Sequence, residues 1–330
     1  MTHLIKLWSP LFSIKALFRT YTIEGALKIL KTYILGGESQ AKIRCGKLEI
    51  HVSERNVREA VELARKLERI IKAGGKSGCY YNYLYIDLNG KWLCRTSKLK
   101  TAIDDILIGP LLGVAYEVEE YEYMERLFKH IIKHANLNDV LFVDVGSYIG
   151  GYAVRACKHG IEVMTIEPHP NNYSMLLKNL KINNCKYIAL NIAAGKDKSI
   201  AYLCEEENGN LASSYIIKQS TRGAFKVKVF PLDEIIPRNK KLFVKIDVEG
   251  KEVEVLEGMK DSLNNVCWMM IEVAERNMPK VINIMKKNNM KLLKYIIRYG
   301  ASKRYQIEFG SRYFNLFFIN HECYKLVRNA

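Results

Sequence analysis

The chain has 330 residues, of which 48% are hydrophobic and 26% charged, and its formal net charge is +16. This balance is typical of a folded globular protein and excludes a wholly disordered or collagen-like chain. No apolar run reaches the ~20 residues that a membrane-spanning helix needs, so we expect no such helix.

The amino-terminal third, residues 1–114, predicts a small α+β region without a chemical motif. Within residues 3–34, apolar side chains recur at helical spacing and predict one or two amphipathic helices. Residues 42–52 predict a strand, and Ser53 is the expected cap of the helix that follows. Residues 80–95 predict a hairpin that turns at its Asn-Gly pair.

Short apolar runs alternate with helical stretches from about Leu137 onward, which predicts βαβ units and a parallel sheet. The last two expected strands are joined by a loop too short for a crossover helix, so they should pair antiparallel. The expected strands are Val140–Val145, Glu162–Glu167, Lys186–Ile192, Leu242–Asp247, Val266–Val273, Leu292–Arg298 and Tyr313–Asn320.

A glycine-bearing turn, FVDVGSYIGG over residues 142–151, joins the first of these strands to a helix. Gly146 lets the backbone approach a ligand closely, and Gly150 relieves crowding where the helix begins. Asp144 lies at the end of the strand, where its carboxylate can receive the ammonium group of a ligand. The turn by itself is common in α/β proteins and names no ligand.

An acidic residue, Glu167, ends the next expected strand, about 20 residues beyond the glycine turn. There it can accept hydrogen bonds from both hydroxyls of a ribose, which implies a nucleoside-bearing ligand. The turn reads G-S-Y-I-G and lacks the middle glycine of G-x-G-x-x-G, which serves a pyrophosphate. The pattern therefore favours S-adenosylmethionine over NAD.

The run Lys245-Ile-Asp247-Val-Glu249-Gly250 stands at the end of the fourth expected strand. If the strand persists, alternation places Lys245, Asp247 and Glu249 on one side. The two carboxylates can activate a hydroxyl or bind a divalent cation. The alternative is a structural ion pair between Lys245 and Asp247. Because ligands bind at the carboxyl ends of such strands, we predict a functional role.

These segments together resemble the FkbM family of S-adenosylmethionine-dependent methyltransferases. The resemblance covers about residues 115–275 and extends toward 320, and K-I-D-V-E-G is its most specific element. It implies a class I, Rossmann-like methyltransferase domain over 115–330, with a seven-stranded, mostly parallel sheet closed by an antiparallel hairpin. It also implies O-methylation of a sugar or related hydroxyl. The motifs are FVDVGSYIGGY, TIEPHPNNYSMLLKNLKIN, NGNLASS over residues 208–214, and VKIDVEGKEVEVLEGM.

Carried over residue by residue, the resemblance assigns the site. Asp247 and Glu249 match the family's signature acids and are the expected catalytic residues. Two positions depart from the family's D-V-G-A-N-x-G and E-P-N-P patterns, namely Ser147-Tyr148 and His169. The expected cofactor is S-adenosylmethionine, with a divalent cation as an option. The resemblance assigns cofactor binding to Asp144, Gly146, Ser147, Gly150 and Glu167, and their neighbours Tyr148 and Pro168 are expected in the same site. Glu120 is added by its position alone, the alternative being that it complements the dipole of its helix.

The positive charge is concentrated at both ends of the chain. Residues 276–330 hold twelve basic and two acidic residues, and residues 1–35 hold five basic and one acidic. Such ends attract an anionic partner, such as RNA, a phosphorylated sugar carrier or a membrane surface. The alternative is a solvated surface that only aids solubility.

Cysteine usage bears on location. The eight cysteines are scattered without a C-x-x-C pair, which in a chain of this length predicts neither a disulfide framework nor a structural zinc site. The first 18 residues lack an uninterrupted apolar core and a small-residue cleavage site, so they do not predict a signal peptide. We therefore expect a reducing, cytoplasmic location, with peripheral membrane contact as an option.

Two other functions stay open beside methylation of a hydroxyl-bearing sugar or glycan. A tRNA or RNA methyltransferase would use the basic surface, and E-P-x-P-x-N-x-x-x-L-x-x-N is similar to RNA-modifying enzymes. Against it, the chain has D-V-E-G where an N-P-P-Y tetrad would bind an amino group. The other is a non-catalytic, membrane-associated protein that retains the fold, against which the intact turn, Glu167 and D-V-E-G all argue.

Overall fold

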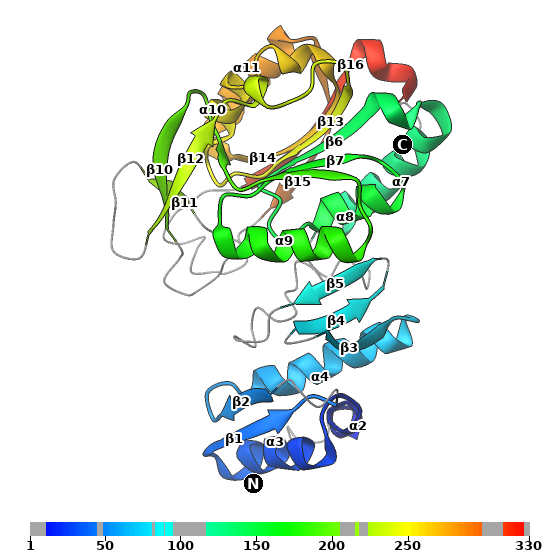
Figure 1. Ribbon diagram of the computed structural model, residues 1–330, viewed down its shortest axis with the longest axis vertical. Helices are drawn as coiled ribbons and strands as arrows, with labels where there is room; N and C mark the ends of the chain where they lie inside the picture. The colour runs from blue at the N-terminus through cyan, green and yellow to red at the C-terminus, as the bar shows by residue number, and fades with distance from the viewer. Residues whose placement is uncertain are drawn as a thin grey trace. The chain divides into compact units, whose positions relative to one another are not determined.

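The chain forms two compact units, Met1–Tyr121 and Glu122–Ala330, in the computed structural model (Figure 1). Their boundary falls inside helix α7 (Val118–His134). The domain limits expected from the sequence, 1–114 and 115–330, remain a prediction. The structure describes residues 11–44, 49–80, 83–88, 90–94, 117–204, 215–217, 224–298 and 313–326.

In the first unit, helices alternate along the chain with short antiparallel sheets, as the α+β prediction requires. Strands β1 and β2 form a hairpin, and β3, β4 and β5 form a second sheet in which each strand pairs with the next. Its elements are α2 (Leu11–Thr20), α3 (Ile23–Leu35), β1 (Glu38–Lys42), β2 (Glu49–Ser53), α4 (Val57–Lys72), β3 (Lys76–Tyr80), β4 (Tyr83–Asp87) and β5 (Lys91–Cys94).

Two details predicted for this unit are wrong. The single strand expected over residues 42–52 is the junction of two antiparallel strands, β1 and β2. Helix α4 is preceded by Asn56 at its N-cap position, and Ser53 instead ends β2, where its N–H donates to Asn56 Oδ1 at 2.6 Å. Asn89, expected in the β4–β5 turn, lies outside the described residues.

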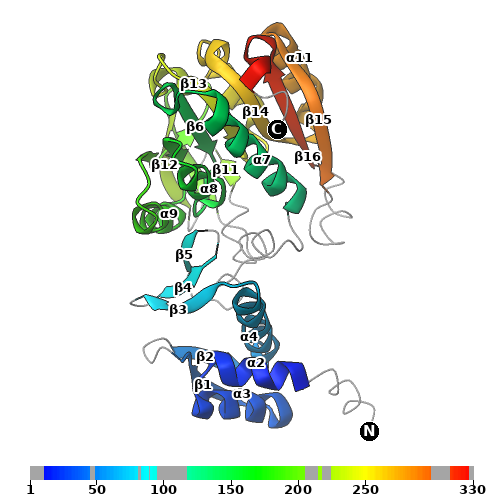
Figure 2. The same cartoon turned by 90° about the vertical axis from the view of Figure 1, so that its right-hand side faces the viewer.

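The second unit is built on a seven-stranded sheet in which β16 alone runs against its neighbours, since it pairs antiparallel with both β14 and β15. Figure 2 shows this β15–β16 pair at one edge. The remaining neighbours pair in parallel, which confirms the predicted Rossmann-like sheet. In spatial order the strands are β15 (Met290–Arg298), β16 (Tyr313–Asn320), β14 (Val266–Ala274), β13 (Lys241–Ile246), β6 (Val140–Val145), β7 (Val163–Ile166) and β8 (Tyr187–Leu190).

Helices cover both faces of this sheet. Helices α8 (Gly151–Lys158) and α9 (Pro170–Ile182) lie on one face, and α10 (Glu252–Glu257) and α11 (Met278–Lys287) lie on the other (Figure 1). Because helices cover both faces, every residue of the central strand β6 is buried. Short 3-10 helices complete the unit: η1 (Leu137–Asp139), η2 (Leu232–Glu234), η3 (Ser262–Asn265), η4 (Glu275–Asn277) and η5 (His321–Leu326).

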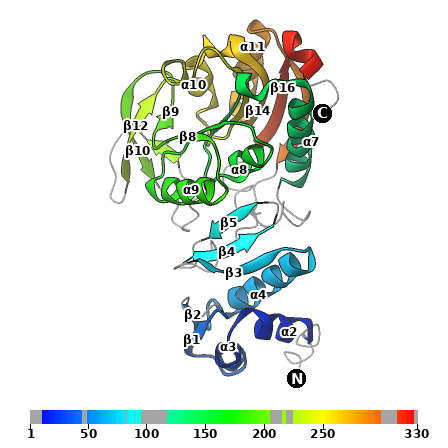
Figure 3. The same ribbon diagram turned by 45° about the vertical axis from the view of Figure 1, so that its right-hand side comes forward.

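A second, four-stranded sheet lies between β8 and β13 in the chain, and the sequence analysis missed it (Figure 3). Its strands alternate between buried and exposed residues, and Ala201, Leu203, Val227 and Val229 form a small core of their own. In spatial order the strands are β11 (Tyr215–Ile217), β10 (Ser199–Cys204), β12 (Phe225–Phe230) and β9 (Ala193–Ala194).

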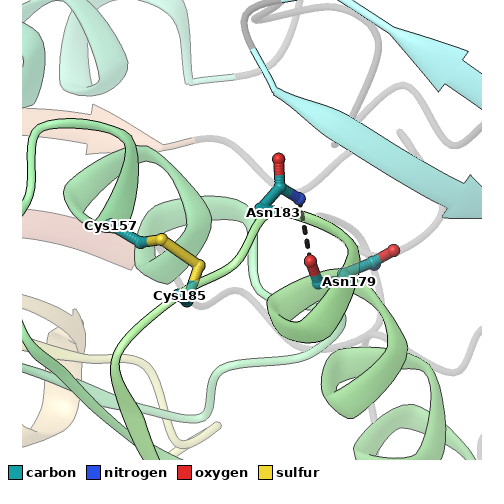
Figure 4. Close-up of a disulfide and its surroundings, with 4 residues drawn as sticks. All are labelled: Cys157, Asn179, Asn183 and Cys185. Atoms are coloured by element: carbon teal, nitrogen blue, oxygen red, sulfur yellow. Dashed lines mark hydrogen bonds between the residues drawn. A yellow bond between two sulfur atoms is a disulfide. The ribbon is translucent and has the colours of Figure 1, made fainter.

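Disulfides contradict the expectation of reduced cysteines. Cys157 at the end of α8 is bonded to Cys185 before β8 (Figure 4), and Cys267 of β14 is bonded to Cys323 of η5. Cys79 is also disulfide-bonded. The two pairs are 28 and 56 residues apart in sequence, so only the fold brings them together. The argument from cysteine spacing for a reducing location therefore fails.

Among the helices of the described residues, none is long and apolar enough to cross a membrane.

The order of strands reverses beside β6, because the chain continues to β7 on one side and returns to β13 on the other. At such a point the loops after the two central strands separate, and ligands of open α/β sheets bind there. Strands β6 and β13 pair in parallel with Lys245 opposite Asp144. The glycine turn and Asp247 therefore follow adjacent strand ends.

Candidate active site

The turn after β6 and the loop after β13 pack backbone against backbone. Gly146 has a φ of +76°, and a Cβ atom on it would lie 1.8 Å from the carbonyl oxygen of Asp247. The Asp247 N–H donates to Val145 O at 2.9 Å. A side chain at position 146 would therefore displace the loop that carries Asp247.

Tyr148 and Gly150 both lie in the left-handed region, with φ of 51° and 97°. Tyr148 stands where the family pattern has Asn, a residue that adopts this conformation more readily. Its backbone N–H donates to Glu167 Oε2 at 2.8 Å. The carboxylate of Glu167 thus holds the turn at Tyr148.

Ser147 joins the ends of two strands. Its buried hydroxyl donates to Asp144 O at 2.6 Å and accepts a hydrogen bond from Ile166 N at 3.0 Å. The side chain thus connects the end of β6 to the end of β7, and its role toward a cofactor stays a prediction.

Asp144 is 1% exposed. Its Oδ2 accepts a hydrogen bond from Ala153 N at 3.2 Å, while Oδ1 has no hydrogen-bond partner among the described residues and lies 3.8 Å from Lys245 Nζ. Burial raises the pKa of Asp144 to about 6, and the Lys245 charge opposes this rise.

Glu167 braces the glycine turn, a role that the sequence analysis did not foresee. Its Oε2 accepts from Tyr148 N, and its Oε1 accepts from His169 N at 2.9 Å. Burial raises the pKa of Glu167 to about 7, and these backbone donors oppose the rise. The Asn172 side chain is a third donor to this carboxylate, so about one acceptor position remains, and the role of Glu167 toward a ribose stays a prediction.

His169 accounts for the second departure from the family pattern. The residue is buried at the N-cap of α9, where its Nδ1 accepts a hydrogen bond from Asn171 N at 3.2 Å. An Asn side chain at an N-cap accepts the same kind of bond. Pro168, in the same loop, accepts at its carbonyl oxygen from Asn191 Nδ2 at 3.0 Å.

Lys245 and Asp247 form the charged centre of the site. Lys245 Nζ lies 3.1 Å from Asp247 Oδ2 and 3.2 Å from Gly146 O, and it stands over the Tyr152 ring at 5.3 Å from the centroid. The Lys245 side chain is 5% exposed, whereas that of Asp247 is 30% exposed. A fixed carboxylate thus reaches solvent directly beside the glycine turn.

Glu249 does not follow the strand alternation predicted for it. Strand β13 ends at Ile246, and Glu249 has a φ of 49° in the loop. Its charge contributes, after burial, to raising the pKa of Tyr313 to about 12. Glu249 thus lies near the start of β16, while Lys245 contacts Asp247.

The loop that carries Glu249 is clamped to η4. Glu252 Oε1 accepts from Gly250 N at 2.6 Å, and Glu252 Oε2 accepts from Asn277 Nδ2 at 2.7 Å. These two bonds hold the conformation of the D-V-E-G segment.

Glu120, the remaining expected cofactor residue, is a buried residue of α7 in the first unit, and its role stays a prediction. The stretch 208–214 lies outside the described residues. Within the described ranges, no group of three or more His, Cys, Asp or Glu side chains is arranged to hold a metal ion.

The residues at the ends of β6 and β7 fit S-adenosylmethionine. The Oδ1 atom of Asp144, a buried carboxylate oxygen without a hydrogen bond in the described structure, suits an ammonium group. Glu167 keeps acceptor capacity for about one further donor, such as a ribose hydroxyl. Asp144 accepts a hydrogen bond from α8, and Glu167 accepts one from the glycine turn, so the turn and its helix hold the two carboxyl groups in place at neighbouring strand ends.

This sheet, with its glycine turn and paired strand-end acids, defines a class I methyltransferase. Residues 144–292 match the family model of the FkbM methyltransferase domain. This match includes the glycine turn and the K-I-D-V-E-G segment on which the predicted resemblance rests, and the protein is an S-adenosylmethionine-dependent methyltransferase.

Among curated proteins, the chain is similar to the hexuronic acid methyltransferase AglP of Haloferax volcanii. The two are 28% identical over 168 residues, which cover 50% of this chain and 68% of the relative.

Two solved structures are distantly similar. The tRNA m1G37 methyltransferase of M. jannaschii shares 16% identity at a TM-score of 0.39, over 89% of this chain and 76% of that chain. The magnesium protoporphyrin IX methyltransferase of Synechocystis PCC 6803 shares 8% identity at a TM-score of 0.37, over 62% of this chain and 81% of that chain.

Proposed function

We propose that this protein transfers the methyl group of S-adenosylmethionine to a hydroxyl of a sugar or glycan. The cofactor supplies an electrophilic methyl group on a sulfonium. One observation carries the proposal: the backbone of Asp247 is packed directly against the glycine turn, and its carboxylate is partly exposed there. The hexuronic acid methyltransferase relative supports a sugar-like acceptor.

In this proposal the acids divide the work. Asp144 receives the ammonium group of the cofactor, and Glu167 accepts the ribose hydroxyls. Gly146, Ser147, Tyr148, Gly150 and Pro168 form the surrounding turns, and Glu120 borders the cofactor as an expectation from the sequence.

Asp247 is the proposed general base. A sugar hydroxyl is a poor nucleophile until its proton is being removed, and a positioned carboxylate contributes roughly 10²–10⁴-fold to such a step. Glu249 is a second candidate for this role, or for binding a divalent cation together with Asp247. The two mechanisms separate experimentally, since a chelator abolishes activity only if a cation is required.

The Asp247→Asn variant tests the role of this residue. We expect it to fold and to bind S-adenosylmethionine like the parent while losing most turnover, roughly 10²-fold or more. Turnover and calorimetric cofactor affinity are measured on the same preparation. A near-parental rate would leave Asp247 as a structural partner of Lys245.

The acceptor class is tested with labelled S-adenosylmethionine. The purified protein is incubated separately with RNA, glycolipid and soluble sugar fractions, with Asp247→Asn as the matched control. We expect label in a sugar-containing fraction with the parent only. Label in RNA would contradict the proposed acceptor and favour the alternative in which basic surface binds nucleic acid.

A further inference from the structure

We propose that Lys245 is a positioning residue for methyl transfer, which fixes the carboxylate of Asp247 against the glycine turn. This inference rests on the proposed function, because Lys245 acts through Asp247. From the sequence, the one role expected for Lys245 itself is that of a partner in a structural ion pair. Its contacts in the fold indicate that it also orients the carboxylate of Asp247.

The ammonium group of Lys245 is buried, and removing such a charge from water is costly unless other groups compensate it. Three oxygens do so: Asp247 Oδ2 at 3.1 Å, Gly146 O at 3.2 Å and Asp144 Oδ1 at 3.8 Å. The first two accept hydrogen bonds from the ammonium group, and the third forms an ion pair with it. Lys245 is therefore committed to protein groups and is not placed to bind the acceptor itself.

These oxygens belong to the parts that methyl transfer must align. Gly146 lies in the turn proposed to hold the cofactor, Asp144 is the proposed ligand of its ammonium group, and Asp247 is the proposed base. Lys245 contacts all three, although Gly146 is 99 residues away from it in the sequence. A single side chain thus ties the base to the cofactor turn.

The backbone makes this tie rigid. Asp247 N donates to Val145 O at 2.9 Å, and the Asp247 carbonyl oxygen lies where a Cβ atom of residue 146 would be. With the main chain held, the remaining freedom of Asp247 is in its side chain, and Lys245 holds one of its two oxygens. A displacement of about 1 Å between reacting groups can cost 10²-fold in rate, so this orientation matters.

Lys240 provides a matched control. It lies just before the opposite end of β13 and also pairs with a carboxylate, since its Nζ lies 3.2 Å from Glu162 Oε2. Its side chain is largely buried as well, at 17% exposure. It has no contact with the glycine turn in the described structure, so it reports what the loss of an ion-paired lysine does to the fold alone.

The test is a double-mutant cycle on kcat and on KM for both substrates. We expect Lys245→Met to lower kcat about 10- to 100-fold, with a smaller change in acceptor KM. Lys245→Gln, which keeps a hydrogen-bond donor, should recover part of the loss, and Lys240→Gln should keep kcat within about two-fold. In an Asp247→Asn background, Lys245→Met should cause no further loss, since the group it positions is gone.

Two results would overturn the inference. One is a kcat of the Asp247→Asn, Lys245→Met double variant that falls by the product of the two single losses, and the other is a parental kcat in a folded Lys245→Met variant. Circular dichroism and calorimetric cofactor affinity show whether each variant is folded, and Lys245→Gln serves the same cycle if the Met variant does not fold. The cycle is run with whichever fraction accepts the label. A wrong acceptor class and a wrong role for Lys245 therefore give different results.

Discussion

Glu167 shows how burial changes the proton chemistry of a single residue. Desolvation raises its pKa to about 7, so the carboxyl is largely protonated below that pH and ionised above it. Only the ionised form offers its full acceptor capacity to the ribose hydroxyls. We expect the affinity for S-adenosylmethionine, measured by calorimetry, to increase from pH 6 to pH 8.

The control for this pH dependence is Glu167→Gln, which keeps the size of the side chain and does not titrate. It should bind the cofactor with a flatter pH profile, and Glu167→Ala should bind roughly 10- to 100-fold more weakly, or about 1–3 kcal/mol. If Glu167→Ala keeps parental affinity, the cofactor binds elsewhere.

Tyr148 carries local strain, because a non-glycine residue in the left-handed region costs roughly 1–2 kcal/mol. Asn tolerates this conformation, and the family pattern has Asn here. We expect Tyr148→Asn to raise the free energy of unfolding by about 0.5–1 kcal/mol, as measured by denaturant titration. A clear loss of stability would show instead that the Tyr side chain contributes more than the strain costs.

At the scale of elements, one disulfide and a chain of amides fasten α8 and α9 around the glycine turn. Figure 4 shows Cys157–Cys185 beside Asn183, whose Nδ2 donates to Asn179 O at 2.8 Å. Asn179 Nδ2 in turn donates to Ile149 O of the turn at 2.9 Å. The helix ends and the turn are therefore held by groups on the same segment.

This arrangement predicts an effect of the disulfide on stability. Replacing both Cys157 and Cys185 by Ser should lower the free energy of unfolding by about 3–4 kcal/mol, because the crosslink restricts the unfolded chain. Denaturation with and without reductant measures it. Cys204, a half-buried cysteine of β10 in the second unit, is the control, and Cys204→Ser should stay within about 0.5 kcal/mol. If the double Ser variant and the parent had the same free energy of unfolding, the Cys157–Cys185 disulfide would not stabilise the fold as predicted.

At the scale of the whole molecule, the basic carboxyl-terminal region remains the feature without an assigned partner. Lys286 and Lys287 end α11, and Lys291 and Lys294 lie on β15. We expect their joint replacement by Gln to weaken use of an anionic acceptor and to flatten its salt dependence, while cofactor affinity stays unchanged. Parental turnover and salt response would mean that these lysines form only a solvated surface.

Much of the second unit was predictable because its signals are local. Apolar runs of strand length mark β6, β13 and β14, and a glycine turn or an acid directly follows the strands of the site. The sequence did not predict the short strands β9 to β12, because their core is made of few residues. These strands also pair with partners that are distant from them within the segment between β8 and β13. The β1–β2 hairpin was read as one strand because no Gly or Pro pair marks its turn strongly.

The sequence by itself indicated the resemblance to FkbM methyltransferases, the class of sheet and the strand ends proposed to carry the site, because each follows from residue types within a few positions of one another. The tertiary structure alone decided what the site residues do to each other. Lys245 meets Gly146 across 99 residues, and Cys267 meets Cys323 across 56. Glu167 binds the backbone of Tyr148, 19 residues earlier. Such contacts depend on how strands pair in space, and the spacing of residues along the chain does not encode them.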